Sequence, residues 1–223
     1  MTALQVDHLV VGAHTLDNGV AWCEATFGVR PTSGGEHRFM GTHNRVFDVS
    51  SAGFARVYLE IIAIAPTLPA PAGRRWFDLD DGLVRQQLKQ SGPQLLAWAA
   101  RCDDIALAAA AMRSAGIDAG EVMDAERMTP AGLLRWRIAL RADGARPCGG
   151  AAPILIEWGE RHPTDTLIDS GVRLESLQVG ASVPDRLLPA QVRLACASNG
   201  AALTAAFATP RGRVTLHSPD AKG

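Results

Sequence analysis

The chain has 223 residues, 47% of them hydrophobic, and its 22 basic residues offset 23 acidic ones to a formal net charge of -1. This length lies between one typical domain and two, and the apolar content is enough for a full core. The near-neutral charge, with no long run of like charges, argues against nucleic acid as the main partner and against a polybasic membrane anchor.

The cysteines and the first residues indicate the compartment. The four cysteines are widely spaced and form no C-x-x-C pair, which favours reduced thiols over a zinc or redox motif. Residues 1–8 lack the basic and apolar regions of a signal peptide, and no apolar run approaches the roughly 18 residues of a membrane span. We therefore expect a cytoplasmic protein without a membrane partner.

The first part of the chain predicts a strand, a helix and further strands. Residues 6–11 are mostly apolar and β-branched, which is typical of a strand. Thr15 is suited to begin a helix and Gly28 to end it. Two more strands are expected at 45–49 and 56–64.

The same order of elements returns about 90 residues later. A strand is expected at 95–100, followed by a helix between Asp103 and Gly116 and by strands at 133–140 and 154–158. A shorter third copy follows as a strand at 172–179, a helix at 184–197 and a hairpin at 203–217.

The repeat suggests how the chain is divided. Residues 66–73 are rich in Pro and Ala and have the composition of a linker. We place a first module at 1–65, a Pro-rich linker with a short helix at 66–93, a second module at 94–160 and a partial third unit at 161–223, all packed as one domain.

Two carboxylates lie inside strongly apolar strands. Glu60 is flanked by Leu59 and Ile61, and Glu157 follows Ile156. A buried, unpaired carboxylate costs several kcal/mol or takes up a proton. Each glutamate therefore needs a metal, an arginine or a water-filled cleft, unless it faces solvent from an edge strand.

Histidines are the other candidates for metal or proton chemistry. His8 lies on the first strand among apolar residues, so it is either a hydrogen-bonded core residue or a metal ligand. Neutral imidazole together with carboxylates suits Zn²⁺, Ni²⁺, Fe²⁺ or Mn²⁺. His43 comes just before a strand, where it either belongs to a turn or reaches the wall of a cleft.

Four further side chains are candidates for substrate binding. Arg75 and Trp76 follow the Pro-rich linker and either anchor a loop or contact a substrate anion. Trp136 either fills the core or stacks on a ligand. Arg137 lies on the other face of the same strand, where it could neutralise Glu157 or an anionic substrate.

Paired βαβββ units, with a histidine on the first strand and a glutamate on the last, resemble the vicinal oxygen chelate superfamily. That superfamily includes glyoxalase I, extradiol dioxygenases and bleomycin-resistance proteins, and the chain is most similar to its glyoxalase-like domain proteins. The matching stretches are residues 41–44, 58–63, 75–77, 134–137 and 153–158. The resemblance implies an α+β fold in which paired βαβββ modules form a curved mixed sheet around a central cleft, with a partial third βαββ unit beside it.

The resemblance also implies a site with one divalent metal. Carried over position by position, it makes His8, Glu60 and Glu157 the metal ligands, with Glu157 also the catalytic base and His43 a second catalytic residue. The fourth ligand position departs from the family pattern, because the residue equivalent to His8 in the second module is Leu96. The sequence therefore leaves two cases open: a single Zn, Ni, Fe or Mn ion, or no metal.

Three functions follow from these alternatives. The first is a metal-dependent lyase or isomerase that polarises a carbonyl or enediolate oxygen and transfers the adjacent proton. The second is an Fe²⁺ dioxygenase of extradiol type, which would need His43 as a second histidine ligand. The third is a metal-free binding protein of the resistance type or a metal-independent enzyme. All three take a small oxygenated metabolite, and a homodimer is compatible with each.

Overall fold

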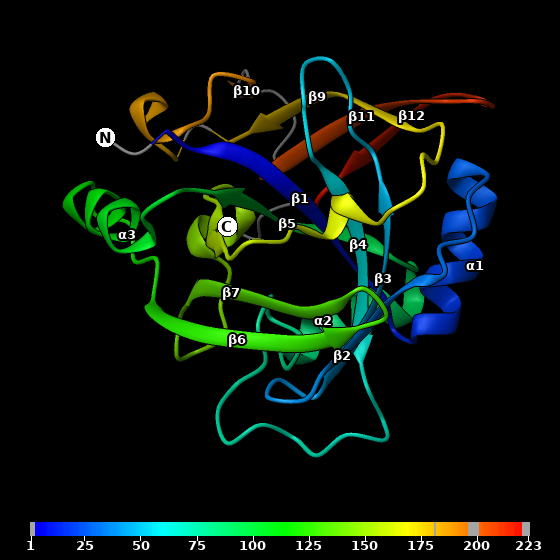
Figure 1. The fold of residues 1–223 in the computed structure, drawn as a ribbon, viewed down its shortest axis with the longest axis horizontal. Coiled ribbons are helices and arrows are strands. Elements are labelled where there is room, and N and C mark those ends of the chain that lie inside the picture. Colours follow the sequence, from blue (N-terminus) through cyan, green and yellow to red (C-terminus); the bar gives the residue numbers. More distant parts are fainter. Residues whose placement is uncertain (1–2, 181, 196–200, 220–223) are drawn as a thin grey trace.

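The computed structural model of the protein describes residues 3–180, 182–195 and 201–219, and Figure 1 shows its fold. The first module consists of β1 (Gln5–Gly12), α1 (Leu16–Phe27), β2 (Ser33–His37), β3 (Thr42–Asp48) and β4 (Tyr58–Ile64). After α2 (Gly82–Gln90), the second module consists of β5 (Gln94–Arg101), α3 (Ile105–Ser114), β6 (Glu121–Thr129), β7 (Gly132–Leu140) and β8 (Ile154–Trp158). Each module therefore has the predicted βαβββ order.

The two modules form one eight-stranded sheet in the order β2-β3-β4-β1-β5-β8-β7-β6. The first strands of the modules, β1 and β5, pair antiparallel at its centre, whereas β1 with β4 and β5 with β8 are parallel. The end strands β2 and β6 contact each other, so the sheet curves until it nearly closes (Figure 1). The predicted α+β class and curved mixed sheet are confirmed.

Helix ends follow the local sequence. Thr15 begins α1 by accepting a hydrogen bond from the Asn18 N–H, and Gly28 ends it with a φ of 75°, as predicted. In α3 the capping residue is Asp104, not the predicted Asp103, because the Asp104 carboxylate accepts from the Leu107 N–H.

A second sheet of four strands packs on the outer face of the first. Its strands are β9 (Arg173–Val179), β10 (Val192–Leu194), β11 (Leu203–Thr209) and β12 (Gly212–His217), in the order β10-β9-β11-β12. It shares an apolar core with α1, in which the rings of Phe27 and Phe207 lie 5.2 Å apart. Figure 1 shows this sheet, yellow to red, across β1 and β5.

The helix predicted at 184–197 is wrong in its described part. Residues 185–187 form a single 3-10 turn and 192–194 form β10, whereas 196 and 197 lie outside the described residues. Pro189 explains the difference, because a proline inside a helix supplies no N–H donor and clashes with the preceding turn. The hairpin predicted at 203–217 is confirmed.

Irregular pairing between β1 and β5 decides which side chains face the inside of the curved sheet. The register shifts between Val6 and His8, so Val6 and Leu9 both pack in the outer core while Asp7 and His8 lie between them. A second shift lets Leu96 and Ala97, although adjacent, both pack in the inner core. Such bulges re-aim side chains and recur near functional sites.

Candidate functional site

Asp7 lies at the centre of a buried polar cluster on the inner face of the sheet. Its carboxylate accepts hydrogen bonds from His8 Nδ1 at 2.6 Å, His162 Nε2 at 2.9 Å and Trp158 Nε1 at 3.0 Å. Burial by itself would raise the pKa of Asp7, but the hydrogen bonds from His162 and His8 outweigh it and hold that pKa well below its usual range. Asp7 is therefore ionised, and its three hydrogen-bond partners all donate to it.

This carboxylate fixes the tautomer of His8. Because an ionised carboxylate only accepts, His8 Nδ1 carries a proton, so in the neutral ring the lone pair is on Nε2. Nε2 lies 3.8 Å from Glu60 Oε2, and the Tyr58 ring stacks on the imidazole with ring centroids 4.6 Å apart. His8 thus presents a fixed proton acceptor beside a carboxylate, the orientation that a general base requires.

Glu60 is connected to a cation through Asn44. Its Oε1 accepts from Asn44 Nδ2 at 2.6 Å, and Asn44 Oδ1 accepts from the Gly35 N–H at 2.9 Å and from the Arg127 guanidinium at 3.2 Å. The bonds to its oxygen fix the direction of the Asn44 amide, so its NH₂ group faces Glu60. Module one supplies the carboxylate and module two the cation.

His37 completes the cluster as a neutral side chain. Its Nδ1 lies 3.2 Å from Thr42 Oγ1 and its Nε2 lies 3.5 Å from Asn44 Nδ2. Burial, and next the positive charge of Arg127, lower the pKa of His37 to about 3. His37 therefore stays uncharged throughout the physiological pH range.

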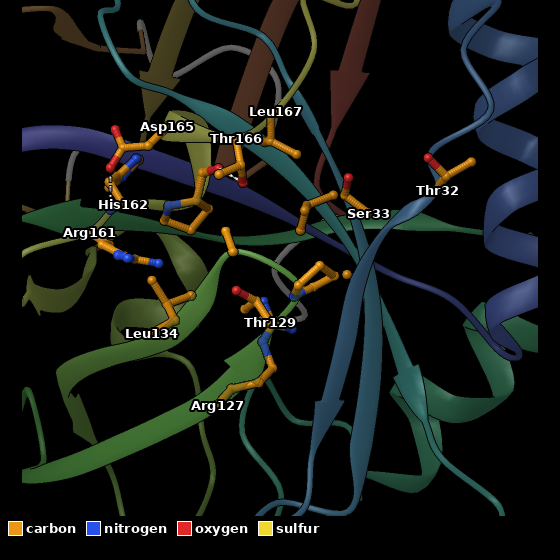
Figure 2. A pocket seen from close by; sticks show the side chains of 15 residues that line it. Thr32, Ser33, Arg127, Thr129, Leu134, Arg161, His162, Asp165, Thr166 and Leu167 are labelled. Atoms are coloured by element: carbon orange, nitrogen blue, oxygen red, sulfur yellow. Dashed lines mark hydrogen bonds between the residues drawn. The ribbon is translucent and has the colours of Figure 1, made fainter.

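A cavity of about 350 Å³ adjoins this cluster. Figure 2 shows Arg127 entering from β6 below, while Arg161 and His162 come from the segment after β8 on the other side. The Arg127 guanidinium donates to Asn44 but forms no ion pair with a carboxylate of the described residues, and burial lowers its pKa. The carboxylate that lines the cavity, Asp165, is paired with Arg56 at 2.8 Å. The cavity is therefore suited to an anion.

The model of one protein family, the glyoxalase-like domain, matches residues 6–195. The chain belongs to the glyoxalase-like domain family. The match confirms the resemblance on which the expected fold rested. Among curated proteins, none matches the sequence significantly.

Solved structures of low sequence identity match this glyoxalase-like protein. A hypothetical protein from Staphylococcus aureus is 15% identical with a TM-score of 0.55, and the alignment covers 98% of this chain and 87% of that one, so the two share a fold. Methylmalonyl-CoA epimerase from Streptomyces coelicolor, a variant crystallised with 2-nitronate-propionyl-CoA, is 19% identical with a TM-score of 0.42 over 70% of this chain and 96% of that one. Methylmalonyl-CoA epimerase from Mycobacterium tuberculosis is 17% identical with a TM-score of 0.40, and the alignment covers 69% of this chain and 86% of that one.

The structure brings His8 and Glu60 together but separates Glu157 from them. On β8, Ile154 and Ile156 pack in the inner core, whereas Leu155 packs in another core with α3. Glu157 shares the face of Leu155, and its carboxylate accepts from the Ile105 N–H at 2.7 Å, at the start of α3. Glu157 of this glyoxalase-like protein therefore lies apart from His8 and Glu60, on the other face of the sheet, and its predicted roles as metal ligand and base stay predictions without support from this geometry.

The four-ligand metal site of the family does not fit these residues. His8 Nε2 and Glu60 Oε2 converge from the first module, but Leu96 and Ile156 occupy the inner face of the second. Asp7 is already satisfied by three donors. Among the described residues, no group of three His, Cys, Asp or Glu side chains is arranged to hold a metal ion. We therefore derive no step through a metal.

His43 also lies away from the cluster. It belongs to β3, and its face carries Arg45 and Phe47, the last of which packs in the outer core under α1. Asn44 and Val46 alternate with these residues and face inward. The expectation that His43 lies in a turn is thus wrong, since His43 is a strand residue. Its side chain lies on the outer face, away from His8 and Glu60, and its catalytic role stays a prediction.

The four residues expected to bind substrate lie outside the 350 Å³ cavity. Arg75 is paired with Asp80 at 2.6 Å, and Trp76 is buried against His37 with ring centroids 4.9 Å apart. Trp136 is also buried in the inner core. Arg137 contacts Glu157 at 3.3 Å on the outer face, which matches the predicted neutralisation of Glu157. Trp136 and Arg137 line a different cavity, of about 450 Å³. Substrate binding by these four residues stays a prediction.

The functional candidates missed from the sequence are Asp7, Asn44, Arg127 and His162. Only Asp7 left a signal, because two successive polar residues inside an apolar strand cannot both face solvent when one face of the strand is buried. No helix among the described residues is long and apolar enough to cross a membrane.

Proposed function

We propose that this glyoxalase-like protein binds a small anionic carbonyl compound in the 350 Å³ cavity and transfers a proton on it without a metal, with His8 as the base. The observation that carries the proposal is the lone pair of His8 Nε2, fixed by ionised Asp7 and directed toward Glu60. Proton transfer by a positioned histidine typically contributes 10²–10⁴-fold to a rate.

The cavity lies one side chain away from this base. Two of its lining residues, Arg127 and His162, hydrogen-bond to Asn44 and Asp7, the residues that hold Glu60 and His8. A bound carbonyl compound that loses a proton to His8 becomes an enolate, and Arg127 supplies the positive charge that stabilises its oxygen. Returning the proton to another atom or face of the enolate would complete an isomerisation or epimerisation.

Charge and size limit the substrate. Arg127 and Arg161 favour a carboxylate or phosphate group, and a volume of about 350 Å³ lies at the low end of ligand cavities. The substrate class is therefore a compact acidic metabolite with a C–H bond next to a carbonyl group.

A metal-dependent lyase or isomerase remains the second candidate. It is favoured by the convergence of His8 Nε2 and Glu60 Oε2 at 3.8 Å. Two protein ligands give a weak site compared with the three of most catalytic zinc sites. This candidate therefore predicts that activity disappears with a chelator and returns with added Zn²⁺, Ni²⁺, Fe²⁺ or Mn²⁺.

The test detects proton transfer whatever the product of the reaction is. Small 2-oxo acids, 2-methyl-3-oxo acids and phosphorylated hydroxyketones are incubated with the protein in D₂O and EDTA, and ¹H NMR follows loss of the proton next to the carbonyl. We expect exchange with at least one class, a loss of about 10²-fold or more in His8→Gln, and full retention in Glu157→Gln, whose side chain lies on the other face. Exchange that requires added metal would establish the second candidate. An exchange rate in His8→Gln equal to that of the wild type would refute His8 both as the base and as a metal ligand.

A further inference from the structure

We infer a second binding site, for an anion with a short apolar group, between the outward-facing side chains of β3 and helix α2. A cavity of about 510 Å³ lies between the N-terminal end of α1, the β3–β4 pair and α2. The alternation of β3 separates it from the cluster described above, because His43 and Arg45 point outward where Asn44 points inward. The inference therefore stands independently of the proposed proton transfer.

Two arginines give this outer cavity its charge. Arg45 and Arg85 both line it, and neither forms an ion pair with a carboxylate of the described residues. Arg45 NH1 donates to the Asn44 carbonyl at 2.8 Å, which holds the side chain in place and leaves its other donors available. The carboxylate among the lining residues is Asp17, in the first turn of α1, so the arginines leave the site with a net positive charge.

His43 adds an unsatisfied polar atom. Its Nε2 is buried and has no hydrogen-bond partner among the described residues. Burial, and next the charge of Arg45, lower the pKa of His43, which favours the neutral ring. This nitrogen is closed to solvent, so a ligand in the cavity does not reach it. The His43 ring itself lines the cavity and therefore reports on binding there.

The remaining wall sets the shape of the ligand. Ile64, Pro66, Leu79 and Leu88 form an apolar surface beside the cationic side chains. A ligand that uses both parts carries a phosphate or carboxylate for Arg45 and Arg85 and a short hydrocarbon group for the apolar wall. The same acidic chemistry can come from a phosphate monoester or a short fatty acid, so both serve as probes.

The experiment titrates ¹³C,¹⁵N-labelled protein with monobutyl phosphate, hexanoate and inorganic phosphate, and follows the ring resonances of His43. We expect saturable shifts with monobutyl phosphate or hexanoate and weaker binding of inorganic phosphate, which lacks the apolar group. Arg45→Gln/Arg85→Gln should weaken binding by at least tenfold. Arg85→Gln alone, at an exposed position on α2, tests the same contact without risk to the fold.

Two control variants each remove one arginine that does not line this cavity. Arg113→Gln removes an exposed arginine of α3, and Arg127→Gln removes the cation of the inner cavity. Neither should change the affinity of the probes at His43. The inference is overturned if His43 does not respond to any probe, if Arg85→Gln binds like the wild type, or if Arg113→Gln weakens binding as much as Arg85→Gln does.

Discussion

Replacing Asp7 by asparagine tests the centre of the buried cluster. The side chain is completely buried and accepts from three N–H groups. In Asp7→Asn two of these bonds become neutral and lose about 1 kcal/mol each, while the third donor meets the new NH₂ group and costs about 1–3 kcal/mol. We expect the free energy of unfolding at pH 7 to fall by about 3–5 kcal/mol.

The pH dependence of the free energy of unfolding tests the ionisation of Asp7 independently. Because the pKa of Asp7 in the folded protein lies below its ordinary value of 3.8, its contribution is fully present above about pH 4 and is lost as the pH falls through the lowered pKa. Urea unfolding of wild type and Asp7→Asn between pH 7 and pH 3 measures both effects. A difference below about 1 kcal/mol at pH 7, or one that grows toward pH 3, would refute the assignment of Asp7 as an ionised hydrogen-bond acceptor.

The same substitution tests the proposed base. If the amide introduced by Asp7→Asn donates to His8 Nδ1, the proton of His8 moves to Nε2 and the lone pair facing Glu60 disappears. In a serine protease the analogous loss of the orienting carboxylate lowers the rate about 10⁴-fold. ¹⁵N chemical shifts of the two ring nitrogens report the tautomer, and an unchanged tautomer in Asp7→Asn would contradict this reasoning.

Three further substitutions separate structural from functional roles. Glu157→Gln should lower the free energy of unfolding by about 1–2 kcal/mol through the start of α3, whereas Glu60→Gln, next to His8 Nε2, should slow proton exchange; the reverse pattern would support Glu157 as the base. Arg127→Gln should raise the KM or Kd of an acidic ligand at least tenfold with little change in melting temperature, since burial opposes its charge; an unchanged affinity would remove it from the anion site. Trp76→Ala should cost about 3–5 kcal/mol as a buried core side chain, and a stable variant with weakened ligand binding would instead support the substrate contact expected from the sequence.

The Glu60 and Glu157 pair shows what a sequence pattern can and cannot predict. Both glutamates interrupt the last apolar strand of a module, and both strands exist where predicted. Alternation identifies which residues share a face, but it does not say which face looks into the cleft. A difference of one residue in position along the strand reverses the face that a side chain occupies. Glu60 therefore joins the buried cluster, whereas Glu157 accepts a hydrogen bond from the first N–H group of α3.

The amino-acid sequence by itself determined the repeat and the unusual positions of His8 and Glu60 inside apolar strands, because periodicity, caps and buried charges are local properties. The α+β class with paired modules was implied by the resemblance to the family. The tertiary structure decided the rest. A register shift placed Asp7 beside His8, and curvature of the sheet brought Arg127 of the second module to Asn44 of the first. The contact of Arg127 with Asn44 joins residues far apart in the chain, and no local pattern encodes a bulge or the closure of a sheet.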